Sequence, residues 1–259
     1  MNNLSRPLEG KKALIFGVAN ERSLAWGIAQ QLKEAGAEIA LTYLGESMER
    51  RVRPLGEKLE ATLIEPCDVQ NEKDLDALFS KVQSHWGTVD ILIHSIAFAQ
   101  KEELEGRFID TTAKGFGLAL QVSAYSLVEL SRRCEPLMPN GSRILTLSYL
   151  GAEKVVPNYN VMGVAKAALE ASVRYLASDL GEKKITVNAI SAGPVKTLAA
   201  VGIRDFRKML SEAKEKTPLK ETIEPEDVGA LASFLCGPGG KRITGTTLYV
   251  DSGAHIMGA

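Results

Sequence analysis

The sequence predicts a single α/β domain, a doubly wound parallel sheet of about seven strands with helices on both faces. Short apolar runs, typical of buried strands, alternate along the chain with amphipathic segments of helical periodicity. Strands that alternate with helices form parallel sheets covered on both faces. The 259 residues contain no repeat, linker or low-complexity tract, so we expect residues 1–259 to share one core.

The expected strands and helices follow one another in order. Strands are expected at 12–17, 38–43, 62–69, 89–94, 144–147, 185–190 and 247–251. Helices are expected at 23–32, 47–60, 74–85, 116–137, 226–235, and from the end of the fifth strand to about 180. Gly36 would end the first helix, Pro54 would interrupt or bend the second, and Asn71 would cap the third.

The composition excludes several classes of partner. The 31 basic and 32 acidic residues give a net charge of −1 without a basic block, which argues against nucleic acid or an anionic membrane as partner. Cys67, Cys134 and Cys236 have no metal-like spacing, so we expect buried, reduced thiols and no metal site. No apolar run reaches about 18 residues, so we expect no membrane insertion and a soluble, cytoplasmic protein.

The most informative stretch follows the fifth expected strand. Tyr149 stands at the carboxyl end of this strand, where open α/β sheets place their ligands. Tyr159 and Lys166 are seven residues apart in a segment with a helical pattern. On an α-helix this spacing is roughly 700° of rotation and about 10.5 Å of rise, so both side chains would share a face. Because a nearby cation favours the phenolate, we expect Lys166 to lower the pKa of Tyr159, a candidate proton donor.

The first connection between a strand and a helix predicts a nucleotide site. Gly17 ends the strand and Ser23 precedes the helix, where a dinucleotide-binding fold holds pyrophosphate on a helix N-terminus. The connection lacks the G-x-G-x-x-G pattern, so a simple turn remains the alternative. After the third strand, Asp68 and Val69 either hold the adenine edge, or Asp68 merely caps the next helix.

In this order, the motifs resemble those of a known family. The chain resembles the short-chain dehydrogenase/reductases, and among them the divergent enoyl-acyl-carrier-protein reductases of bacteria, which carry Tyr-x6-Lys. The resemblance runs from Leu8 to the C-terminus and implies a Rossmann-like fold. Its motifs are Gly17-x5-Ser23, Asp68-Val69, His94-Ser95-Ile96-Ala97-Phe98-Ala99, and the segments 147–153, 158–166 and 188–199.

The resemblance also implies roles for individual residues. Tyr149 and Tyr159 would be catalytic, and Ala99 would lie near the acyl substrate. The implied partners are acyl carrier protein and three further copies of the chain in a homotetramer, with a substrate-binding flap at about 197–218. The implied cofactor contacts are Gly17, Ser23, Leu24, Leu44, Asp68, Val69, Ile96, Lys166, Val195, Lys196, Thr197, Leu198 and Ala199.

NADH is the expected cofactor, and NADPH is less favoured. No acidic residue at the end of the second strand is placed to bind a ribose diol, and Leu44 cannot donate a side-chain hydrogen bond. The basic pair Arg50-Arg51 is not immediately beside Tyr43. NADPH users would need such a pair, so its distance favours NADH.

These residues suit reduction of a C=C bond conjugated to a thioester. Hydride adds to the β-carbon, and the enolate oxygen that develops needs a hydrogen-bond donor. Tyr159 would supply it, Lys166 would bind the nicotinamide ribose, and Tyr149 would flank the substrate or move protons. His94 is expected to be a strand-end residue rather than a base.

Three other functions remain as alternatives. A 3-ketoacyl or other carbonyl reductase would rely on Tyr-x3-Lys, but Gly163 stands four residues after Tyr159 and no other Tyr has Lys at that spacing. A non-catalytic dinucleotide-sensing module would need the nucleotide loop without Tyr149, Tyr159 and Lys166. A structural assembly protein would leave the loop unexplained.

Overall fold

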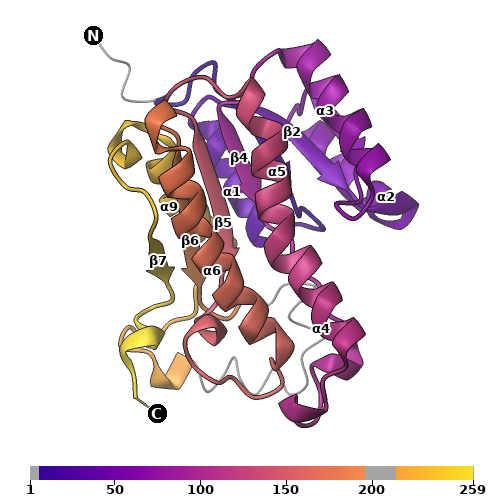
Figure 1. The fold of residues 1–259 in the computed structure, drawn as a ribbon. Coiled ribbons are helices and arrows are strands. Elements are labelled where there is room, and N and C mark those ends of the chain that lie inside the picture. Colours follow the sequence, from indigo (N-terminus) through magenta and orange to yellow (C-terminus); the bar gives the residue numbers. More distant parts are fainter. Residues whose placement is uncertain (1–5, 196–213, 259) are drawn as a thin grey trace.

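The computed structural model describes residues 6–195 and 214–258, and in them seven parallel strands form one sheet (Figure 1). The strands pair in the order β3-β2-β1-β4-β5-β6-β7. Strands 1 to 3 are added toward one edge of the sheet and strands 4 to 7 toward the other, so the strand order switches between β1 and β4. Ligands bind at such a switch point in open α/β sheets. The strands are β1 (Lys12–Phe16), β2 (Glu38–Tyr43), β3 (Leu63–Pro66), β4 (Ile91–His94), β5 (Arg143–Ser148), β6 (Thr186–Ala192) and β7 (Thr247–Val250).

Helices cover both faces of this sheet and bury an apolar core on each. One core joins the sheet to α1 (Leu24–Glu34), α2 (Gly45–Lys58) and α9 (Pro225–Cys236). The other joins it to α3 (Glu72–Trp86), α5 (Ser126–Cys134) and α6 (Val161–Asp179), which lie in front of the sheet in Figure 1. The predicted fold class and order of elements are therefore confirmed. None of the helices in these two ranges is long and apolar enough to cross a membrane.

Two expected helices differ in detail. α2 continues through Pro54 and is not interrupted there, because the buried Val52, Leu55 and Gly56 hold both sides of the proline against the sheet. The helix expected at 116–137 is divided into α4 (Ala113–Leu120), a π-helical segment (Gln121–Tyr125) and α5. Such π segments are frequent at functional sites, and this one carries Ser123 beneath the loop that follows β4.

The helix that carries Lys166 begins later than expected. α6 starts at Val161, so Tyr159 lies in the turn before it. Asn158 and Asn160, on either side, have φ angles of 61° and 34°. Asn tolerates positive φ better than most residues, so the turn can form here. The prediction that Tyr159 and Lys166 share a helical face is therefore wrong.

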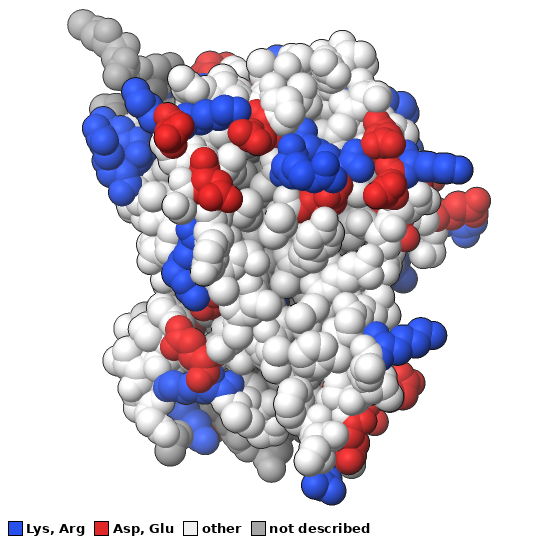
Figure 2. All heavy atoms as spheres, viewed as in Figure 1, with Lys and Arg blue, Asp and Glu red and all other residues white. Residues whose placement is uncertain are grey.

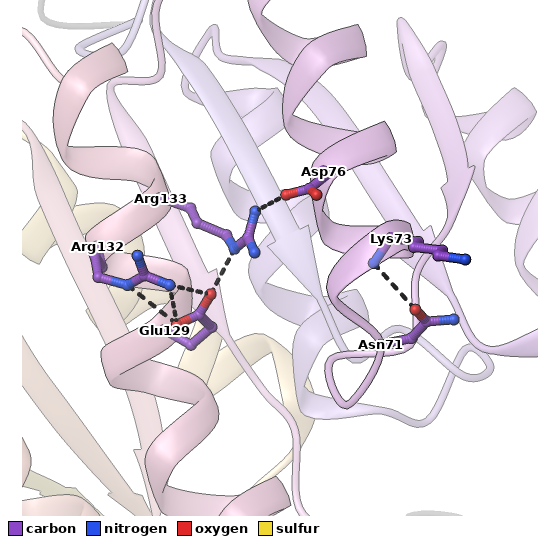
Figure 3. Close-up of polar contacts among 6 residues, drawn as sticks. All are labelled: Asn71, Lys73, Asp76, Glu129, Arg132 and Arg133. Carbon is purple, nitrogen blue, oxygen red and sulfur yellow. Dashed lines mark hydrogen bonds and ion pairs between the residues drawn. The ribbon is translucent and has the colours of Figure 1, made fainter.

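Ion pairs join α5 to α3 on the front face (Figure 3). The Arg133 guanidinium contacts both Asp76 on α3 and Glu129 on α5, with N–O distances of 2.5 Å in each pair. Burial raises the pKa of Glu129, but hydrogen bonds from Arg132 and Arg133 outweigh it and hold the pKa below its ordinary value.

As predicted, Asn71 caps α3, with its side chain accepting a hydrogen bond from the Lys73 N–H at 3.0 Å.

Candidate active site

Two tyrosines meet at the carboxyl end of β5. The ring centroids of Tyr149 and Tyr159 are 5.0 Å apart, and the rings meet edge to face at 69°. Gly151 makes room for them, since a Cβ at this position would lie 2.5 Å from the Tyr159 ring. Gly163 on α6 in turn lies against the Gly151 carbonyl. The turn after β5 and the start of α6 therefore fix the Tyr159 ring together.

Lys166 contacts the same end of β5, two residues before Tyr149. It is only 6 % exposed, and its ammonium donates a hydrogen bond to the Leu147 carbonyl oxygen at 2.6 Å. Burial lowers the pKa of Lys166 to about 8, and the negative charge of Glu170 opposes this. A buried ammonium with remaining donor capacity suits hydroxyl oxygens such as those of a ribose.

The prediction that the pKa of Tyr159 is lowered is wrong, because the pKa is raised and Lys166 is not among the causes of the shift. Burial raises the pKa of Tyr159, and the neighbouring phenol of Tyr149 raises it further. Burial also raises the pKa of Tyr149. The Lys166 ammonium is engaged with a carbonyl of β5, so burial decides the pKa of the phenol. Tyr159 therefore keeps its proton and can donate a hydrogen bond at neutral pH.

The proposed substrate contact Ala99 and the phenol of Tyr159 pack against the same group of buried residues. This small apolar cluster is separate from the two main cores. Phe98, next to Ala99, donates its backbone N–H to Ser123 of the π-helical segment at 3.0 Å. The cluster consists of the buried Ala119, Val161, Met162 and Ala165 and the half-buried Ala99, Leu104, Phe116, Leu120 and Tyr159.

The proposed nucleotide loop joins β1 to α1 at the switch point. Gly17 has a φ of +100°, and a Cβ there would lie 1.9 Å from the Ser95 carbonyl oxygen, so only glycine lets the exits of β1 and β4 approach each other. Ser23 does not cap α1. Its hydroxyl donates to the Asn20 carbonyl at 2.6 Å, so it shapes the loop. The first turn of α1 thus has no side-chain cap, as an anion site at a helix N-terminus requires.

The remaining described cofactor candidates lie at the start of α1 or after the carboxyl ends of β2, β3, β4 and β6. Asp68 does not cap α3, because Asn71 does; its carboxylate instead accepts a hydrogen bond from the Gln70 N–H at 2.9 Å. Leu44, at the end of β2, is 59 % exposed. Leu24, Val69 and Ile96 are half-buried against the cores, and Val195 is buried. Four candidates lie outside the described residues: Lys196, Thr197, Leu198 and Ala199. Most of the expected flap does so too.

A cavity of about 270 Å³ opens beside Tyr149. Its walls include Leu150 and Val156 after β5, Pro194 after β6, and Met257 near the C-terminus.

His94 is not placed to act as a base, as expected. It is fully buried between Thr146 and Ser126, and burial lowers its pKa to about 3.

Sequence reasoning missed three residues of this site: Ser148, Gly151 and Glu170. The Ser148 hydroxyl donates to the carboxylate of Glu170, which is buried on α6. One signal was available for Glu170. It interrupts an apolar stripe of α6 one turn after Lys166, where a buried carboxylate needs partners.

Comparison with known proteins identifies the family. A family model described as Enoyl-(Acyl carrier protein) reductase matches residues 17–255. The enoyl-(acyl-carrier-protein) reductase (NADH) FabI of Rickettsia typhi is 51 % identical, covering 98 % of each chain, and that of Bacillus cereus is 51 % identical, covering 97 % of this chain and 99 % of its own.

Solved structures agree with these sequences. The enoyl-(acyl-carrier-protein) reductase of Anaplasma phagocytophilum in complex with NAD has a TM-score of 0.95 and 50 % identity, covering 98 % of this chain and 97 % of its own. The Bacillus cereus enzyme with NADP+ and indole naphthyridinone has a TM-score of 0.96 and 50 % identity, covering 98 % and 100 %. The chain belongs to the enoyl-acyl-carrier-protein reductase family.

Proposed function

We propose that this protein reduces the trans-2 double bond of enoyl thioesters on acyl carrier protein with NADH, the last step of a cycle of fatty-acid elongation. One observation carries the proposal: two tyrosines in edge contact lie at the carboxyl end of β5, next to a buried lysine. The relatives of Rickettsia typhi and Bacillus cereus, named as NADH-dependent enoyl reductases, support it.

Each of the three side chains has a distinct task in this proposal. When bound, the nicotinamide supplies the hydride that adds to the β-carbon. Tyr159 donates a hydrogen bond to the thioester oxygen, where negative charge develops, and its raised pKa keeps the donor protonated. Lys166 binds the hydroxyls of the nicotinamide ribose. Tyr149 packs on Tyr159 and flanks the substrate, beside Ala99 and its cluster.

The residues of the switch point fit a dinucleotide. The uncapped first turn of α1, reached from Gly17 and Ser23, offers backbone N–H groups to the pyrophosphate. Asp68, Val69, Ile96 and residues 195–199 would contact the cofactor. NADH is favoured over NADPH because Leu44 offers no charge to a 2′-phosphate. Relatives have been solved with NAD and with NADP+.

We also propose a homotetramer in the cytoplasm, in which residues 1–259 form one domain and 197–218 act as a substrate flap. Figure 2 shows charges of both signs on the visible face and a largely uncharged band across its middle, which supports assembly. Tyr125 in the π-helical segment and Val164 and Tyr175 on α6 are exposed. Exposed apolar surface of this kind is typical of interfaces.

Oxidation of NADH, followed by its absorbance, tests the function. We expect turnover with trans-2-enoyl thioesters of crotonyl length or longer, and none with 3-ketoacyl thioesters. The opposite selectivity would show a carbonyl reductase, and tight NADH binding without turnover of either substrate would show a dinucleotide-sensing module. Repeating the assay with NADPH measures the cofactor preference, which we expect to favour NADH.

A further inference from the structure

Glu170 is a buried carboxylate one helical turn after the proposed catalytic Lys166. It lies on α6, is 8 % exposed, and accepts a hydrogen bond from the hydroxyl of Ser148, the last residue of β5. Burial of an ionisable group without a purpose is costly, so a buried carboxylate next to a proposed site calls for an explanation.

Glu170 and Lys166 hold neighbouring residues of the same strand end. They are four residues apart on α6, so they lie on one face of the helix. Lys166 binds the carbonyl of Leu147, and Glu170 binds the hydroxyl of Ser148. Tyr149 is the next residue. The strand end from which Tyr149 extends is thus fixed to α6 at two consecutive positions.

The charge of Glu170 also acts on Lys166. Among the described residues, it is the one carboxylate whose charge raises the pKa of Lys166 against the effect of burial. His94 on β4 is the other titratable neighbour, and it is neutral. Burial raises the pKa of Glu170 itself, and the hydrogen bond from Ser148 opposes this shift. Further out, Glu153 from the turn after β5 raises the pKa and Arg174 from α6 lowers it.

We propose that Glu170 is a positioning residue that fixes the end of β5 through Ser148 and keeps Lys166 in its charged form. This inference rests on the proposed role of Lys166 at the nicotinamide ribose. Without the carboxylate, burial alone would act on the ammonium, and Lys166 would lose its proton at a lower pH. As the pH rises, NADH affinity and turnover would then begin to fall at a lower pH than in the wild type.

The test compares pH profiles of NADH affinity and of kcat/KM for an enoyl thioester. In Glu170→Gln, which keeps the shape of the side chain, we expect the alkaline limb to move to lower pH by about one unit. In Glu170→Asp, which keeps the charge, the limb should stay at the wild-type position. Glu182→Gln, an exposed change beyond the end of α6, is the control and should not differ from wild type.

Ser148→Ala separates the two parts of the proposal. It removes the hydrogen bond and leaves the carboxylate, so kcat should fall several-fold while the alkaline limb stays in place. An unchanged kcat would overturn the positioning part. The idea that Glu170 keeps Lys166 charged would be overturned by either of two results. One is an alkaline limb in Glu170→Gln at the wild-type position; the other is a shifted alkaline limb in Glu170→Asp.

Lys166→Ala distinguishes failure of this inference from failure of the proposed function. If Lys166→Ala binds NADH as tightly as wild type, then the ribose role is wrong. If it loses affinity but Glu170→Gln keeps the wild-type profile, only the role of Glu170 is wrong. Circular dichroism and the thermal midpoint show whether each variant is folded. Should Glu170→Gln not fold, a shifted alkaline limb in Glu170→Asp would still overturn the idea that Glu170 keeps Lys166 charged.

Discussion

At the scale of single residues, burial gives Tyr159 its chemical character. A phenol with a lowered pKa would share its proton poorly with a developing enolate, because it would already be partly ionised. Burial and the contact with Tyr149 act in the opposite direction and raise the pKa of Tyr159. The phenol therefore remains a neutral donor over the whole physiological range, as a group that stabilises an oxyanion must.

We predict that Tyr159→Phe lowers kcat by about 10²-fold or more, because removing one donor to a developing oxyanion costs about this much. NADH affinity, measured by calorimetry, should change little, since the ring and its packing remain. Tyr175→Phe, which removes a phenol that is 77 % exposed on α6, is the matched control and should keep wild-type turnover. Unchanged turnover in Tyr159→Phe would remove this phenol from the mechanism.

Single residues also mark how far the sequence alone can predict the site. Tyr149 was placed correctly, because its position at the end of an apolar strand is a local signal. The contact between Ser148 and Glu170 joins residues 22 positions apart, and nothing in either local sequence specifies it. The pKa of Tyr159 was predicted with the wrong sign because burial, which decides it, depends on packing from several elements.

At the scale of elements, the site depends on a turn that fits against a helix. The short helical turn Leu150–Ala152 follows β5 and packs on the start of α6. Gly151 and Gly163 face each other there, and each lacks the Cβ that would block the contact. The absence of a Cβ at Gly151 leaves space for the ring of Tyr159. Tyr159 itself lies in the turn between Asn158 and Asn160.

We predict that Gly151→Ala lowers kcat by roughly 10²-fold, the effect expected of a displacement of about 1 Å in a catalytic group. The new Cβ would lie 2.5 Å from the Tyr159 ring, so the ring must move. Gly117→Ala on α4, where a Cβ meets nothing within 4 Å, is the control and should keep wild-type rates. Equal rates for both variants would contradict the claim that Gly151 makes room for the Tyr159 ring.

Periodicity predicted the existence and order of these elements better than their ends. All seven expected strands are present, because each is a short apolar run between turn residues. The start of α6 was placed too early, since the residues before Val161 also fit a helical pattern and only the backbone at Asn158 and Asn160 excludes it. The π-helical segment 121–125 shows no distinct periodicity that would separate it from α4 and α5.

At the scale of the whole molecule, one face of the sheet combines internal ion pairs with exposed aromatic side chains. On the face that carries α5 and α6, Arg133 pairs with Asp76 and Glu129 (Figure 3). Tyr175 on α6 and Tyr125 before α5 are 77 % and 56 % exposed. In the proposed tetramer, these exposed side chains would contact another copy through this face.

We predict a particle of four chains of 28.0 kDa each by light scattering during size-exclusion chromatography. Tyr175→Lys would place a charge in an apolar contact, so its assembly should dissociate to smaller species at low micromolar concentration. Ile109→Lys, at a site that is 75 % exposed in the turn Phe108–Asp110 rather than on α5 or α6, should keep the wild-type mass. Because α6 also carries Lys166 and Glu170, we expect dissociation to lower kcat as well. A monomeric wild type with full turnover would show that the site is complete in a single chain.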